Sequence, residues 1–183
     1  MTVSNTQQQL DRIMTLWLAH HKDNLPTVRY DTAWPSPCYV NQSATQDSET
    51  RWQPVRQTEP TDMFERLSAA LEVDIHPTIV DLYTRYWSDP LALKAPDGSL
   101  SLLQVWNTDD LERLRANLIG HAMAKAQQKR TLSLFFALTE PDDGMLTVNN
   151  DNGTVWLEYP GKKPVRQIAE SLPEFLGTLT PAT

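Results

Sequence analysis

One stretch decides the fold: Ser99-Leu-Ser-Leu-Leu-Gln104, then Val105-Trp106, and then a segment that closes in Asn117-Leu-Ile-Gly-His121. The first six residues have the apolar character of a buried strand. Asn107 is a favourable helix N-cap, and Asp110 stands where the second half of a capping box belongs. We therefore expect a strand followed by a helix that begins near Thr108 and ends at His121.

The helical part has a single apolar face. Its apolar residues recur every three or four positions, while its charged residues fall on the other side. The apolar set is Leu111, Leu114, Leu118, Ile119 and Ala122. Gly120 costs about 1 kcal/mol relative to alanine inside a helix, which indicates either close approach of another element or a break. The stretch is interpreted as core, so function must be sought around it.

Size and charge limit the classes of protein. The 183 residues are interpreted as one domain, residues 1–183, with a formal net charge of −7. Such a surface repels nucleic acid and anionic lipid and favours basic partners. The one cysteine, Cys38, indicates a reducing compartment, and we find neither a signal peptide nor an apolar run long enough to span a bilayer. A cytoplasmic protein that reaches membranes only through a protein partner is expected.

Before the central stretch, helices dominate the prediction. A first helix is expected from Asn5 to Lys22, and a surface loop from Leu25 to Pro37. A hairpin of Cys38–Val40 with Arg51–Gln53 and a linker from Val55 to Pro60 follow. Two further helices are expected, one capped by Thr61 with Phe64, Leu67, Ala70 and Leu71 inward, and one that starts at Pro77 and ends at Asp89-Pro90.

After the central stretch, strands dominate. Leu132–Leu138 is apolar enough for a central strand, and turns at Pro141–Gly144 and Asn150–Gly153 flank a second strand at Met145–Val148. Thr154–Tyr159 alternates like a half-buried third strand, and Ser171 opens a short last helix. The expected class is α+β, a single domain with an antiparallel-rich sheet and helices packed around it.

Catalytic and metal chemistry find little support. Cys38, His76 and His121 are the candidates for a thiol and its base, but burial, helix capping and the helix dipole explain them more simply. No histidine pair at metal-ligand spacing and no glycine-rich phosphate loop are present, and we expect no cofactor and no metal. The basic segments Lys125–Arg130 and Gly161–Lys163 are interpreted as a helix C-terminus and a solvated turn.

Acidic residues at the ends of elements are the more interesting group. If several shared one concave face, they would focus a negative potential that attracts a Lys/Arg-rich loop. The alternative is a solvated surface whose acids complement helix N-termini. The candidate binding residues are Glu59, Glu65, Glu72, Asp74, Asp89, Asp109, Asp110 and Glu158.

An ordered set of short motifs resembles the Syd family. They are Ser36-Pro-Cys38, Trp52-Gln-Pro54, Ile75-His-Pro-Thr-Ile79, Leu102-Leu-Gln104 with Trp106, Asn117-Leu-Ile-Gly-His121, and Glu174-Phe-Leu176 with Leu179 and Pro181. Each motif alone is weak, but together they run in the same order from Ser36 to the C-terminus.

The resemblance implies a fold of the SUKH superfamily, which also includes toxin-immunity proteins. It further implies a non-enzymatic protein that is soluble in the cytoplasm and associates peripherally with the cytoplasmic side of the inner membrane through SecY, the Sec translocase channel subunit. Members are thought to regulate or check SecY complexes, and they carry an acidic concavity suited to basic SecY loops. Our leading hypothesis places acids near Glu72, Asp74, Asp89 and Glu158 against those loops. Toxin neutralisation is the alternative function of the same fold.

Overall fold

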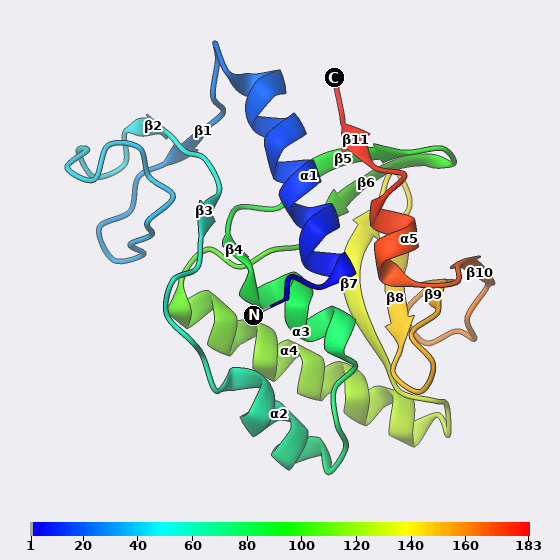
Figure 1. Cartoon of the computed structure of the whole chain (residues 1–183). Coiled ribbons are helices and arrows are strands. Elements are labelled where there is room, and N and C mark those ends of the chain that lie inside the picture. The colour runs from blue at the N-terminus through cyan, green and yellow to red at the C-terminus, as the bar shows by residue number, and fades with distance from the viewer. Residues whose placement is uncertain (1) are drawn as a thin grey trace.

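A seven-stranded antiparallel sheet forms the centre of the computed structural model, which describes residues 2–183 (Figure 1). Its order is β10-β9-β8-β7-β6-β5-β11. The bounds are β5 Leu91–Ala95, β6 Gly98–Leu102, β7 Ser133–Thr139, β8 Met145–Asn149, β9 Val155–Glu158, β10 Arg166–Ala169 and β11 Thr180–Pro181. Residues Leu132–Leu138 were predicted as a central strand, and β7 lies in the middle of the sheet, which confirms that prediction.

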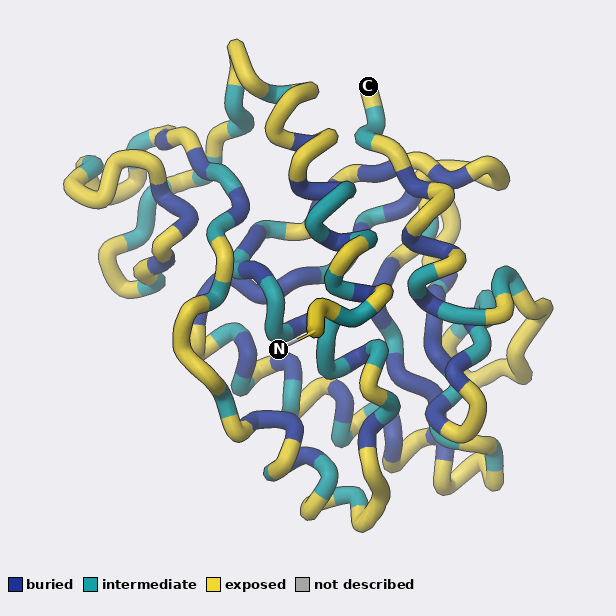
Figure 2. The backbone as a smooth tube through the Cα atoms, in the orientation of Figure 1, coloured by how far each residue is buried: buried dark blue, intermediate teal, exposed yellow. Residues whose placement is uncertain are grey.

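In the described part of the chain, five helices pack around the sheet. They are α1 Asn5–His21, α2 Met63–Leu71, α3 Pro77–Thr84, α4 Thr108–Gln127 and α5 Leu172–Leu176. Helix α1 packs against α3, α5 and β11, whereas α4 packs against β7 and α2. Buried residues gather where the helices meet the sheet, and exposed ones line the outer turns (Figure 2). The α+β class predicted from the sequence is confirmed as a single-domain fold.

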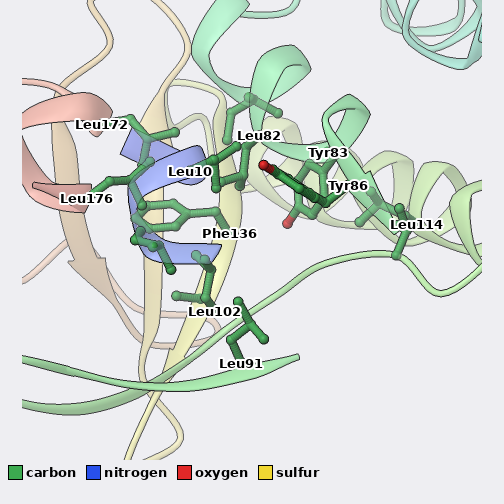
Figure 3. Packing of buried hydrophobic residues seen from close by; sticks show 14 of the residues in the cluster. Leu10, Leu82, Tyr83, Tyr86, Leu91, Leu102, Leu114, Phe136, Leu172 and Leu176 are labelled. Atoms are coloured by element: carbon green, nitrogen blue, oxygen red, sulfur yellow. The ribbon is translucent and has the colours of Figure 1, made fainter. Parts of the chain in front are cut away.

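The core lies between α1, α3 and the central strands. Phe136 of β7 contacts Phe175 of α5 in an edge-to-face arrangement, with ring centroids 5.8 Å apart. Tyr83 of α3 is fully buried and donates its hydroxyl hydrogen to the Phe135 carbonyl at 2.8 Å. Figure 3 shows Phe136 of β7 packed with Leu10 of α1 and Leu102 of β6. Residues from the whole length of the chain therefore share one core.

The helix of the stretch that decides the fold begins where predicted but ends later than predicted. Asn107 caps α4 by accepting the Asp110 N–H at 2.8 Å, but the Asp110 carboxylate accepts from the Trp106 N–H rather than from Asn107. The helix does not end at His121 but continues to Gln127. No other element approaches Gly120, so that residue marks neither a break nor a close contact.

The segments before α4 contain more strand than predicted. The supposed loop after α1 holds β1 Thr27–Arg29, which pairs with β2 Glu49–Arg51. The expected hairpin is reduced to one bridge between Tyr39 and Trp52. The supposed linker holds β3 Val55–Arg56, paired with β4 Tyr86–Trp87, because α3 ends at Thr84 rather than at Asp89-Pro90.

Smaller corrections concern the helix faces. The predicted cap Thr61 lies one residue before the N-cap position, which Asp62 occupies, although the Thr61 hydroxyl still accepts the Met63 N–H at 3.2 Å. Ala70 was expected to face inward but is exposed. The meander β7-β8-β9 and the capped helix α5 follow the prediction, whereas β5, β10 and β11 were not foreseen. Within residues 2–183, no helix has the length and apolar character needed to cross a membrane.

Candidate functional site

A hollow of about 800 Å³ lies beside the first turns of α4, and we call it the acidic hollow. One wall comes from β1 and the loop after it, another from α4, and the floor from the segment that joins β6 to α4. Figure 1 shows the β1-β2 region next to that end of α4. The lining includes Arg29, Asp31, Trp34, Tyr39, Asp47, Asp89, Gln104, Trp106, Asp110, Arg113 and Asn117.

Hydrogen bonds hold the walls in place. The Ser36 hydroxyl donates to the Trp106 carbonyl at 2.7 Å, and the Asn107 side-chain amide donates to the Pro35 carbonyl at 2.8 Å. The Tyr39 ring meets the Trp106 ring edge-to-face, with centroids 5.2 Å apart. Two of the family-like motifs, the one around Ser36 and the one that includes Trp106, are therefore joined directly. The hollow keeps its shape because its opposite walls share these bonds.

The hollow holds more carboxylates than cations. Arg29 is paired with Asp47 at 2.7 Å, and Arg113 is paired with Asp110 at 2.6 Å. Among the described residues, the two remaining aspartates that line it, Asp31 and Asp89, form no ion pair. Burial raises the pKa of the Asp89 carboxyl, and the nearby charge of Asp110 raises it further. A cationic group that entered the hollow would stabilise the Asp89 carboxylate and so offset both the cost of burial and the repulsion from Asp110.

The structure brings two of the eight predicted acids into this hollow, Asp89 and Asp110. Asp109 is exposed on the adjoining turn of α4. Four others lie elsewhere on the surface: Glu59 after β3, Glu65 on α2, Glu72 at the left-handed end of α2 and Asp74 before α3. Asp31 and Asp47 were missed, because the segment around Asp31 had been interpreted as a featureless loop and Asp47 as part of a hairpin turn.

Glu158 does not belong to any acidic surface. Its side chain is buried, with the whole residue 1% exposed, and it forms an ion pair with Lys125 of α4. It also accepts hydrogen bonds from the hydroxyls of Ser133, at 2.6 Å, and Thr147. Burial alone would raise the pKa of Glu158, but these three donors outweigh it and hold the pKa below its usual value. The prediction that Glu158 meets a partner is therefore wrong.

The candidate catalytic residues Cys38 and His76 have structural roles, one in the core and one as a helix cap. Cys38 is fully buried, and burial raises the pKa of its thiol to about 11, while the groups that hydrogen-bond it are Ser36 and Val55. His76 caps α3 by accepting the Thr78 N–H at 3.3 Å, and Gly153 lies so close to its ring that a Cβ would collide with it. In the described part of the chain, no group of three His, Cys, Asp or Glu residues could hold a metal ion.

Comparison with known proteins agrees with the motifs. The family model described as "Syd protein (SUKH-2)" matches residues 7–181. The Protein Syd of Pseudoalteromonas atlantica is 40% identical over 184 residues, covering 98% of each chain. That of Alteromonas mediterranea is 40% identical over 94% of each, and that of Colwellia psychrerythraea is 39% identical over 86% of this chain and 82% of its own. The chain belongs to the Syd family.

Proposed function

We propose that this protein is a non-enzymatic binding protein that takes basic cytoplasmic loops of SecY into its acidic hollow. It would do so at the cytoplasmic face of the inner membrane, where it is peripheral, and it would also be soluble in the cytoplasm. There it would regulate or check SecY complexes. The partner comes from the family resemblance. The observation that carries the proposal is the surplus of carboxylates in the hollow, among which Asp89 has no ion-pair partner within the described residues.

Asp89 is suited to receive a Lys or Arg side chain. It is half-buried and lies close enough to Asp110 for their charges to interact. An incoming cation would lower the cost of that burial and offset the repulsion, which is the usual basis of charge complementarity at interfaces. Trp34 and Tyr39 add aromatic surface on which the aliphatic stem or the cation of such a side chain can lie. Arg113 already lies over the Trp34 ring, 5.5 Å from its centroid.

Vesicles of uncharged phosphatidylcholine, with and without SecY, test the proposal, because they offer no anionic lipid. We expect binding to SecY vesicles that weakens as ionic strength rises, because the Debye length falls to about 3 Å at 1 M salt. Asp89→Asn should weaken binding about ten-fold, since it removes the unpaired charge. Glu72→Gln is the matched control: it makes the same change in net charge outside the hollow and should bind like the wild type. Binding that ignores SecY or salt would contradict the proposal.

The same vesicle experiment distinguishes SecY binding from toxin neutralisation, the other function that the resemblance implies. A toxin-immunity protein would show no preference for SecY vesicles. It would instead form a complex with a toxin domain encoded next to its own gene and abolish that toxin's activity. The SUKH-2 description of the matching family is the observation that favours this second function.

A further inference from the structure

A second cleft, of about 580 Å³, lies at the opposite end of α4 from the acidic hollow. We call it the basic cleft. Its rim carries Lys129 and Arg130 from the turn after α4 and Lys163 from the loop after β9. Nothing in the local sequence indicates that these two segments meet. The structure places them on one cleft, so they form a single cluster of positive charge rather than two solvated ends.

The charges of this cleft are not neutralised from within. Among the described residues, none of the three rim cations forms an ion pair with a carboxylate. The carboxylate that lines the cleft, Glu158, is already occupied by Lys125 and by two hydroxyls. Asp151 lies on the turn after Asn149 and is outside the lining. The cleft therefore presents a net positive charge to whatever approaches it.

Backbone hydrogen bonds fix both sides of the rim. Lys129 has a left-handed backbone, with φ of 55°, and its N–H donates to the Ala126 carbonyl at 3.0 Å. The Arg130 N–H donates to the Lys125 carbonyl at 2.9 Å. On the other side, the Val165 N–H donates to the Leu157 carbonyl of β9 at 2.8 Å, which holds the loop that carries Lys163. The cations are presented on anchored turns, so little backbone order has to be gained on binding.

The negative charge of the rest of the protein does not cancel this potential. Helix α4 has 20 residues, which at ~1.5 Å per residue puts about 30 Å between its ends. The Debye length is about 8 Å at physiological ionic strength. The acids of the hollow are therefore screened from the basic cleft. The partial negative charge at the C-terminus of α4, about half an elementary charge, is smaller than that of three full cations.

We propose that the basic cleft docks on the phosphate groups of an anionic lipid bilayer, independently of any SecY contact. Each Lys or Arg near such a surface contributes favourably, and the effect is additive over a small cluster. Val165 is two residues beyond Lys163 in the same loop and is 54% exposed, so this loop carries an exposed apolar side chain as well as a cation. Basic residues flanked by exposed apolar ones suit a membrane interface. A nucleic acid would instead use a longer basic stripe with several stacking aromatic residues, whereas Trp156 is the one aromatic residue among the described residues that line this cleft.

Vesicles that contain no SecY test this proposal with the full-length protein. We expect it to sediment with vesicles of phosphatidylcholine and phosphatidylglycerol, and not with phosphatidylcholine alone. The triple variant Lys129→Gln, Arg130→Gln, Lys163→Gln should lose affinity at least about ten-fold. All three side chains lack carboxylate partners, and an unchanged thermal unfolding transition would verify that the variant folds.

A second triple variant separates the cleft from overall charge. Lys22→Gln, Arg56→Gln and Lys94→Gln change the net charge by the same amount, at sites outside the cleft. It should bind anionic vesicles within about two-fold of the wild type. Equal losses in the two variants, or equal binding to neutral vesicles, would overturn the proposal. So would binding of inorganic phosphate or single-stranded RNA that depends on the cleft while anionic vesicles are not bound.

Discussion

The two ends of α4 carry charge in opposite ways. At the N-terminal end, the side chain of Asp110 is 15% exposed and that of its partner Arg113 is 65% exposed, so the guanidinium of the pair faces water. At the C-terminal end, the side chains of Lys125 and Glu158 are 7% and 2% exposed. Both ends follow the helix dipole, with acid at the start and base at the end. The Asp110–Arg113 pair reaches the surface, whereas the Lys125–Glu158 pair is part of the core. We therefore expect mutations of the two pairs to have different effects.

The buried pair should give the largest effect. Lys125→Ala leaves the Glu158 charge uncompensated inside the protein, and we expect a loss of about 3–5 kcal/mol in the free energy of unfolding. Urea denaturation at neutral pH measures it. Lys129→Ala removes an equal charge from the exposed rim nearby and should stay within about 0.5 kcal/mol of the wild type. Similar losses in both variants would show that the two ends of α4 do not differ in this way.

The pH dependence of that loss identifies its origin. The pKa of Glu158 is lowered in the folded state, so this carboxylate stabilises the fold above the ordinary value of 4.5, and the contribution fades as pH falls through the folded-state pKa. Lys125→Ala removes the donor that holds the charge. The gap between variant and wild type should therefore narrow as pH falls below 4.5.

Sequence patterns predicted the parts of the fold whose signals are local. The Asn107 cap and the turns around β8 come from residues that act on their own neighbours. The Lys125–Glu158 pair joins residues 33 positions apart, and no periodicity reports such a contact. The same holds for β1 and β2, whose two short strands are separated by a long loop, and for β11, whose partner β5 lies far back in the chain. Their pairing depends on the tertiary fold.

The N-terminal end of α4 should give the next largest effect. Asn107→Ala removes the cap bond to the Asp110 N–H and the bond to the Pro35 carbonyl. We expect a loss of about 1–2 kcal/mol in the free energy of unfolding. Asp109→Asn, in the same first turn but exposed, should cost only a few tenths of a kcal/mol. If the cap variant were as stable as the Asp109 variant, the anchoring of the hollow's wall would need another explanation.

The candidate site was predicted less completely than the fold. Asp89 and Asp110 could be singled out because acids at the ends of elements recur in binding surfaces. Asp31 and Asp47 could not, since nothing in the local sequence indicates that their loop folds over α4. The inclusion of Glu158 was an error of a different kind, because burial of a charged side chain depends on a partner supplied by another element.

Asp89 allows a test in which stability and binding change in opposite directions. Its pKa is raised in the folded state, so its charge opposes folding at pH values above that pKa. Asp89→Asn should therefore raise the free energy of unfolding at neutral pH by up to about 1 kcal/mol, while it weakens SecY binding. The gain should shrink as pH falls through the raised folded-state pKa and vanish well below the ordinary value of 3.8, where the carboxyl is protonated in both states. A destabilised variant at neutral pH would mean that Asp89 has a structural partner.

Substitution of Arg113 should give the smallest effect, a change in SecY binding that comes from charge and not from a change in the fold. It neutralises part of the hollow without being buried, so Arg113→Gln should make the hollow more negative and tighten SecY binding about two-fold at low ionic strength. Arg115→Gln removes the same charge two residues further along α4, outside the lining, and should leave binding unchanged. The difference between the two variants should disappear at high ionic strength. Weaker binding by Arg113→Gln would indicate that this guanidinium helps to receive the partner, rather than competing with it for Asp110 and the Trp34 ring.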